Sequence, residues 1–107
     1  MNITLEQAII ICRDIEERLK EIDYHCGLTG SILYKGWSEK DIDIIVYPHQ
    51  VKEQKTVVDI LRHLQMDTPC YPSQKNRFAK DIMPSTADKV VFVCEYKGIR
   101  IDFFFLI

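Results

Sequence analysis

The feature that most constrains the fold of this chain is an aspartate inside a strongly apolar run. Asp102 lies within Ile99-Arg100-Ile101-Asp102-Phe103-Phe104-Phe105. Residues alternate between two faces of a strand, so Asp102 shares a face with Arg100 and Phe104, and Ile101 and Phe103 point the other way. A carboxylate in such surroundings is costly unless another group compensates its charge, and a divalent cation is one such group.

A second alternating run, Asp41 to Tyr47, also predicts a strand. Asp41 and Asp43 share one face, and the opposite face carries Ile42, Ile44 and Val46. Two carboxylates a short distance apart on one face have the arrangement that a shared cation needs. Nine residues separate this run from the dipeptide Gly30-Ser31, a small turn.

Local patterns predict the remaining elements. Thr4 and Gln7 form a capping box that opens a helix from Thr4 to Ile22. The other predicted elements are a strand from Tyr24 to Thr29, one helical turn after Ser31, a helix from Val51 to Gln65, a short strand from Asn76 to Lys80 within a loop from Met66 to Ala87, and a hairpin of Asp88–Tyr96 and Ile99–Ile107 joined at Lys97-Gly98. In the second helix, the predicted apolar stripe consists of Val57, Val58, Leu61 and Leu64.

These elements predict an α+β fold in two layers, with a mixed β-sheet covered by helices on one face. A length of 107 residues predicts a single domain, 1–107, with one core. Placing the strand from Asp41 beside the strand from Ile99 would gather Asp41, Asp43 and Asp102 on one surface.

The net charge and the cysteine positions indicate which binding partners and which cellular compartment to expect. The net charge of −2 provides no basic stripe, so a long nucleic-acid partner is not expected. The four cysteines occupy scattered positions, which favours reduced, mostly buried thiols in a cytoplasmic protein over disulfides or zinc. The histidines His25, His49 and His63 are separated and have no metal-binding spacing. We expect no signal peptide and no membrane span.

The order of Gly30-Ser31, Asp41-Ile42-Asp43 and a later strand carboxylate resembles the nucleotidyltransferase superfamily of DNA polymerase beta. The signature of that family is Gly-Ser, a spacer of roughly a dozen residues, Asp-x-Asp and a third carboxylate. Its small members often carry a basic residue and a glycine after Gly-Ser, and a serine just before the aspartates. Lys35, Gly36 and Ser38 occupy those places, and the resemblance extends from Tyr24 to Phe105.

The resemblance implies both a polymerase beta-like core and a role for each motif residue. Asp41, Asp43 and Asp102 would be the catalytic carboxylates and the ligands of two Mg²⁺ ions, with Mn²⁺ as the alternative. Gly30 and Ser31 would approach the β- and γ-phosphates of a nucleoside triphosphate, with Lys35 and Lys40 as phosphate-binding cations. The implied activity is a metal-dependent transfer of a nucleoside monophosphate, AMP from ATP by preference, to a hydroxyl of a protein or small molecule.

A structural explanation of the aspartates and two other functions stay open at this stage. Asp-x-Asp alone is also typical of a solvated strand end, and Asp102 alone is typical of a charge that protects an edge strand. A second function is a non-enzymatic, antitoxin-like or regulatory nucleotide-binding module that acts through a helical partner protein. A third is a partner-dependent enzyme that modifies antibiotics. Because larger relatives append a helical domain, we expect a helical toxin-like partner or a second copy of the chain to complete the cleft.

Overall fold

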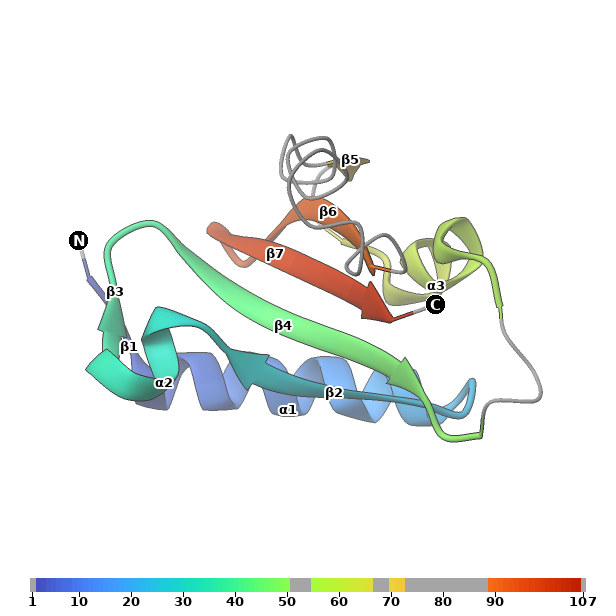
Figure 1. Ribbon diagram of the computed structural model, residues 1–107, viewed down its shortest axis with the longest axis horizontal. Helices are drawn as coiled ribbons and strands as arrows, with labels where there is room; N and C mark the ends of the chain where they lie inside the picture. Colours follow the sequence, from blue (N-terminus) through green and yellow to red (C-terminus); the bar gives the residue numbers. More distant parts are fainter. Residues whose placement is uncertain (1, 51–54, 67–69, 73–88, 107) are drawn as a thin grey trace.

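The fold of the computed structural model consists of a β-sheet with helices packed on one face (Figure 1). The structure describes residues 2–50, 55–66, 70–72 and 89–106. Its elements are β1 (Ile3–Thr4), α1 (Leu5–Lys20), β2 (Tyr24–Thr29), α2 (Ser31–Lys35), β3 (Trp37–Ser38), β4 (Asp41–Pro48), α3 (Val57–Leu64), β5 (Tyr71–Pro72), β6 (Lys89–Tyr96) and β7 (Ile99–Leu106).

The main sheet is mixed, which confirms the predicted α+β class. Its strand order is β2-β4-β7-β6-β5. Strands β4 and β7 pair in parallel, and the other neighbours pair antiparallel. The short strands β1 and β3 form a separate antiparallel pair. The parallel pairing places the strand that carries Asp41 and Asp43 beside the strand that carries Asp102.

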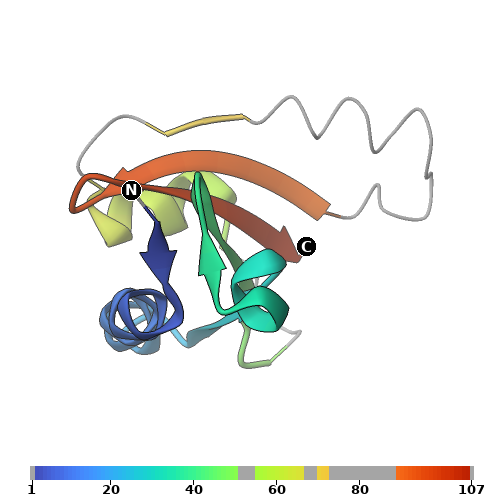
Figure 2. The same ribbon diagram turned by 90° about the vertical axis from the view of Figure 1, so that its left-hand side faces the viewer.

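The hydrophobic core lies between the sheet and the helices α1 and α3. Figure 2 shows both helices on the same side of β6 and β7. Alternate residues of β4 and β7 are buried against them, as the alternation predicted, and each of these side chains is at most 2% exposed: Ile42, Ile44, Val46, Ile101, Phe103 and Phe105. The helices contribute Ala8, Ile11, Ile15, Leu19, Ile60 and Leu64. The other face of β4 carries Asp41 and Asp43, followed by Ile45 and Tyr47.

Helix α1 begins as its sequence predicted and ends slightly earlier. Thr4 Oγ1 accepts a hydrogen bond from the Gln7 backbone N–H at 3.2 Å, and Gln7 Oε1 accepts one from the Thr4 N–H at 3.0 Å. The helix stops at Lys20, and Ile22 packs against the core from the following turn. Across the described residues, no helix combines the length and apolar content needed to cross a membrane.

Helix α3 differs from its prediction at its start and in its buried face. Thr56 has an extended backbone and caps the helix by accepting a hydrogen bond from the Asp59 N–H, so the helix begins at Val57 and not at Val51. Val58 is 53% exposed and was wrongly assigned to the apolar stripe, because Ile60 takes that place with 2% exposure. The stretch 51–54 lies outside the described residues.

The C-terminal hairpin forms as predicted. Lys97 and Gly98 connect β6 to β7 with positive φ angles of 52° and 77°, and Tyr96 pairs with Ile99 across them. Two positive φ angles characterise the tight turn that matches the natural twist of a hairpin. The strand predicted at 76–80 lies outside the described residues.

The cysteine prediction was wrong for two of the four residues. Cys70 and Cys94 form a disulfide with their Cα atoms 4.7 Å apart. The antiparallel pairing of β5 with β6 sets Tyr71 opposite Val93, which brings the preceding Cys70 to the level of Cys94. The pairing of β5 with β6 brings the two cysteines together, and their separation of 24 residues in sequence did not predict this. The inference of a cytoplasmic location from four reduced cysteines therefore no longer holds.

Candidate metal centre

Three aspartates from two neighbouring strands converge at one point of the sheet. In the parallel register of β4 and β7, Asp41 lies opposite Arg100 and Asp43 lies opposite Asp102. One carboxylate oxygen from each of Asp41, Asp43 and Asp102 lies within 4.8 Å of the other two. The expected gathering of these three carboxylates is therefore observed.

The carboxylates differ in their access to water. Asp102 is 0% exposed, although it lies on the face of β7 that is turned away from the helices. Asp41 and Asp43 are partly exposed, while the Oδ1 atom of Asp43 is buried. An incoming ligand would therefore meet Asp41 and Asp43 first and Asp102 at the base of the group.

Gly30 is fitted closely against this group. It caps α2 with φ 74° and ψ −157°, a conformation that is essentially restricted to glycine. A Cβ atom added to Gly30 would overlap Asp43 Oδ2 and lie 3.1 Å from Asp43 Cγ. Thr29, at the end of β2, pairs directly with Asp43. The strand pairing and the missing side chain together bring the Gly30 backbone against the Asp43 carboxylate.

The other motif residues are placed less closely. Ser31 is the first residue of α2, and the Gly30 carbonyl accepts the first helical hydrogen bond from the Leu33 N–H. The Lys35 ammonium lies over the ring of Trp37, 5.6 Å from its centroid. The Lys40 side chain is exposed, and its backbone N–H donates to Ser38 Oγ. Among the described residues, Asp41, Asp43 and Asp102 form the convergent group of acidic ligands, and phosphate binding by Lys35 and Lys40 stays a prediction.

Arg100 is the residue of this centre that the sequence analysis missed. Its Nε donates to Asp102 Oδ1 at 3.0 Å and lies 3.9 Å from Asp41 Oδ2. The hydrogen bond to Asp102 raises the pKa of the Arg100 guanidinium; burial opposes this rise, and the charges of Asp102 and Asp41 add to it. Its position on the same strand face as Asp102 was readable from the sequence, but its contact with Asp41 depends on the β4–β7 register.

The donor set of this centre fits a hard divalent cation. Mg²⁺ and Mn²⁺ prefer carboxylate oxygens, and Mg²⁺ is usually held in proteins by one or two carboxylates together with waters and substrate phosphates. Three carboxylates with oxygens within 4.8 Å of one another provide such donors, and the missing side chain of Gly30 lets the Asp43 carboxylate take its place in this group. Asp41, Asp43 and Asp102 are therefore the residues that would hold the cation.

Arg100→Gln should make the folded chain more dependent on a divalent cation. The change removes the guanidinium that pairs with the fully buried Asp102. Because the Arg100 side chain is 47% exposed, we expect a modest loss of about 1–2 kcal/mol in the free energy of unfolding in EDTA. Magnesium should restore much of that loss, so the thermal shift on adding Mg²⁺ should be larger than in the parent.

Lys97→Gln is the control. Lys97 lies in the turn of the hairpin that carries Arg100, but its ammonium pairs with the exposed Asp14 of α1. Chemical denaturation in EDTA and in Mg²⁺ measures both variants. An Arg100→Gln protein that unfolds like Lys97→Gln under both conditions would contradict the role assigned to Arg100.

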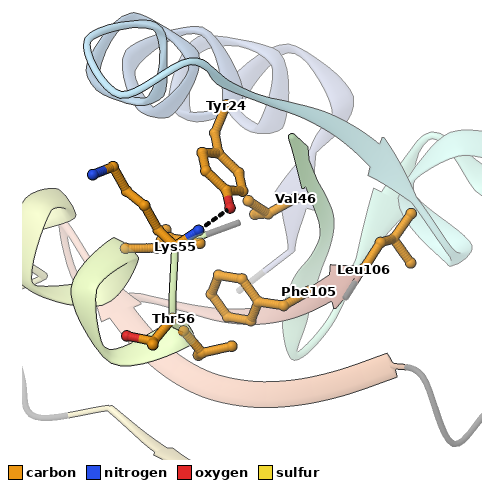
Figure 3. A pocket seen from close by; sticks show the side chains of 8 residues that line it. Tyr24, Val46, Lys55, Thr56, Phe105 and Leu106 are labelled. Carbon is orange, nitrogen blue, oxygen red and sulfur yellow. Dashed lines mark hydrogen bonds between the residues drawn. The ribbon is translucent and has the colours of Figure 1, made fainter. Parts of the chain in front are cut away.

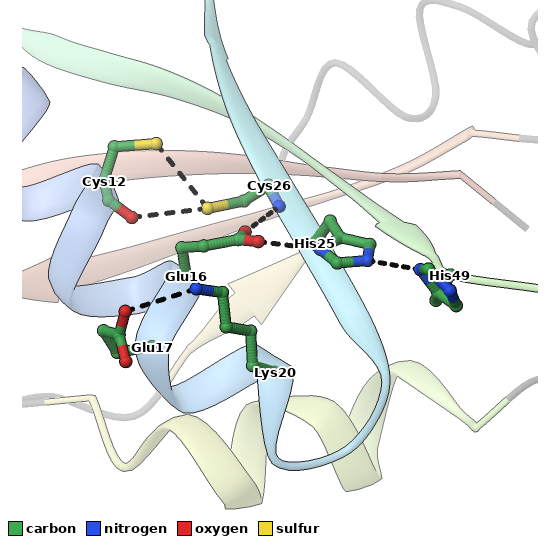
Figure 4. A network of polar contacts seen from close by, with 7 residues as sticks. All are labelled: Cys12, Glu16, Glu17, Lys20, His25, Cys26 and His49. Atoms are coloured by element: carbon green, nitrogen blue, oxygen red, sulfur yellow. Dashed lines mark hydrogen bonds and ion pairs between the residues drawn. The ribbon is translucent and has the colours of Figure 1, made fainter.

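A second polar cluster joins α1 to the edge strand β2 (Figure 4). Glu16 Oε2 accepts a hydrogen bond from the Cys26 N–H at 2.7 Å, and Glu16 Oε1 contacts His25 Nδ1 at 2.7 Å. His25 Nε2 lies 2.8 Å from His49 Nδ1, so these two histidines meet in space although 24 residues separate them in sequence. Burial raises the pKa of the Glu16 carboxyl, but the hydrogen bonds from His25 and Cys26 outweigh it and the net shift is downward.

Glu16→Gln should destabilise the chain at neutral pH and have progressively less effect in acid. A carboxyl whose pKa is lower in the folded state contributes stability above its unfolded pKa, about 4.3, and loses it as the pH falls through the folded value. We expect a loss of about 1–2 kcal/mol at pH 7, because the amide has a single oxygen, which can accept only one of these two hydrogen bonds and carries no charge. Denaturation from pH 7 to pH 3 measures it, with the exposed Glu17→Gln as control. A pH-independent difference from the parent would contradict the role of the Glu16 charge.

An apolar cavity of about 160 Å³ lies at the opposite end of β4 from Asp41 (Figure 3). Val46, Phe105 and Ile60 contribute to its walls. At its rim the Tyr24 hydroxyl accepts a hydrogen bond from the Lys55 backbone N–H at 2.7 Å. Its position and its apolar walls separate it from the aspartate group.

The comparisons with known proteins leave the site to be interpreted from its own geometry. No protein-family model and no curated protein matches this chain.

Proposed function

We propose that this chain is a metal-dependent nucleotidyltransferase that moves AMP from ATP to a hydroxyl of a protein or small molecule. The observation that carries the proposal is the convergence of Asp41, Asp43 and Asp102 from two parallel strands. The close approach of Gly30 to Asp43, in the Gly-Ser turn that precedes the Asp-x-Asp strand, supports it. The cytoplasm, where ATP is supplied, is the proposed location.

The acceptor oxygen attacks the α-phosphorus of ATP, so that a bond forms between them while the bond from the α-phosphorus to the bridging oxygen of the β-phosphate breaks. The AMP moiety is thereby transferred and pyrophosphate is released. Bound Mg²⁺ would neutralise charge on the triphosphate and on the attacking oxygen. Asp41 and Asp43 are partly exposed and would orient the triphosphate through the cation they hold. Because Gly30 has no side chain, the Asp43 carboxylate lies directly against the Gly-Ser turn, where the phosphates would bind. Asp102, at the base of the group, would accept the proton of the acceptor hydroxyl.

Arg100 supports a second candidate function, a nucleotide-binding or interaction module without turnover. Its contacts with Asp102 and Asp41 place a positive charge where a catalytic cation would sit. A site neutralised from within keeps its fold without a metal. For both candidate functions we propose a partner that completes the cleft, either a helical protein or a second copy of the chain.

A thermal-shift titration with each of the four ribonucleoside triphosphates, with and without Mg²⁺, tests the binding step. A ligand at about 100 times its dissociation constant adds roughly 2.7 kcal/mol, a shift that a domain of this size reports readily. We expect a Mg²⁺-dependent shift that is largest with ATP. The absence of a shift with any triphosphate would contradict nucleotide binding by the chain alone.

Asp102→Asn separates the enzyme from the binding module. The amide keeps the size of the side chain but neither accepts a proton nor binds a cation well. We expect pyrophosphate release to fall by about 100-fold or more, the usual range for a lost general base, with a smaller loss of ATP binding. Equal loss of both would contradict this division of roles. Binding by the parent without any pyrophosphate release, with candidate partners present, would favour the module.

A further inference from the structure

Cys12 and Cys26 bring two thiols together between α1 and β2 (Figure 4). Their sulfur atoms lie 3.5 Å apart, and Cys26 Sγ is also 3.4 Å from the Cys12 carbonyl oxygen. Cys26 is on the helix-facing side of β2, opposite the buried Val46 of β4. The two residues are 14 apart in sequence and come from two different elements. Both side chains are partly exposed, so a small reagent can reach them.

The surroundings hold this pair in place. Glu16, one turn after Cys12 on α1, accepts a hydrogen bond from the Cys26 backbone N–H. The outward N–H of the edge strand is thereby bonded to the helix, and the Cys26 side chain stays directed at Cys12. His25 contacts the other oxygen of Glu16. A bond between the two sulfurs would need them to approach from 3.5 Å to about 2.05 Å, a movement that side-chain rotation can supply.

We propose that Cys12 and Cys26 form a redox-active dithiol site that undergoes thiol–disulfide exchange with low-molecular-weight disulfides. The Cys12 thiolate attacks one sulfur of the small disulfide, forms a mixed disulfide and releases one thiolate. Cys26 then loses its proton and attacks Cys12 Sγ, which forms the Cys12–Cys26 bond and releases the second thiolate. The protein dithiol loses two electrons and two protons, and the small disulfide becomes two thiols.

The roles of the two sulfurs follow from their hydrogen bonding. The contact with Cys26 lowers the pKa of the Cys12 thiol, against the effects of burial and of the Glu16 charge. The same contact, followed by burial, raises the pKa of Cys26. The thiolate is the nucleophile in exchange, so Cys12 is the attacking thiol and Cys26 the resolving one. The new bond would tie α1 to the strand that leads into Gly30.

The test equilibrates the full chain, with its Cys70–Cys94 disulfide intact, in glutathione buffers from fully reduced to fully oxidised. Free thiols are then quenched in acid with N-ethylmaleimide, and peptides are mapped without reduction. We expect the Cys12 and Cys26 peptides to lose their label together and to appear as one cross-linked peptide. Full labelling of both residues in oxidised glutathione, or glutathione on either residue without a cross-linked peptide, would overturn the proposal.

Two serine variants test the assigned order. Cys26→Ser should accumulate glutathione on Cys12, whereas Cys12→Ser should react at Cys26 at least about tenfold more slowly. Equal rates, or a faster Cys26, would overturn the assignment of the attacking thiol. Melting curves establish whether both variants fold. If either variant does not fold, the glutathione equilibration of the parent chain still tests the proposal. No metal or nucleotide enters these experiments, so their outcome is independent of the proposed transferase activity.

Discussion

Asp43→Ala should abolish the Mg²⁺-dependent binding of ATP and leave the chain folded. Asp43 belongs to the convergent carboxylate group and lies against Gly30. Loss of groups that merely support a metal ligand typically costs 10–100-fold in affinity, so loss of a ligand should weaken binding by at least about 100-fold. The folded state should survive in EDTA, because the change relieves repulsion among clustered carboxylates.

Calorimetric titration of Mg²⁺ and ATP, beside melting curves in EDTA, measures both effects. Glu39→Ala is the matched control, since Glu39 is an exposed carboxylate two residues before Asp41 and outside the ligand group. It removes the same charge from the same region and should leave binding within about twofold of the parent, a change of under 0.5 kcal/mol. Parent-like binding by Asp43→Ala would contradict the assignment of the metal centre.

The carboxylate group was predictable from the sequence because each step depended on strand alternation. Asp43 lies between the buried Ile42 and Ile44, Asp41 lies two residues before Asp43, and Asp102 lies between Ile101 and Phe103. The common face of the three aspartates therefore followed from a period of two. What remained was the pairing of the two strands. The parallel register of β4 with β7 sets Asp43 opposite Asp102, and only with this pairing do the three oxygens meet.

Features that depend on register or on competition between local signals were not predictable. The contact of Arg100 with Asp41 and the Cys70–Cys94 disulfide both result from which residues face each other across strands. The start of α3 was placed too early, at Val51, because the N-terminal cap at Thr56 was not recognised in the sequence. Hydrophobic periodicity identifies the helices and strands, whereas N-terminal caps decide where a helix begins and strand register decides which residues lie opposite each other.

Gly30→Ala should damage both the stability of the chain and the metal centre. The Gly30 conformation, φ 74° and ψ −157°, costs a residue with a side chain about 1–3 kcal/mol. The added methyl group would also overlap Asp43 Oδ2, so the Asp43 carboxylate or the β2–α2 turn has to move. We expect a loss of about 2–4 kcal/mol in the free energy of unfolding and a loss of Mg²⁺-dependent ATP binding comparable to that of Asp43→Ala.

Gly36→Ala separates the clash from the backbone strain. Gly36 also has a positive φ, 81°, but a Cβ atom there would have no heavy atom within 4 Å. It should therefore lose about 1 kcal/mol of stability and keep its Mg²⁺-dependent binding of ATP. Denaturation and calorimetry of the two variants make the comparison. If Gly30→Ala binds ATP like Gly36→Ala once both are folded, the Gly30 contact does not shape the site, and the Gly-Ser turn would serve the fold alone.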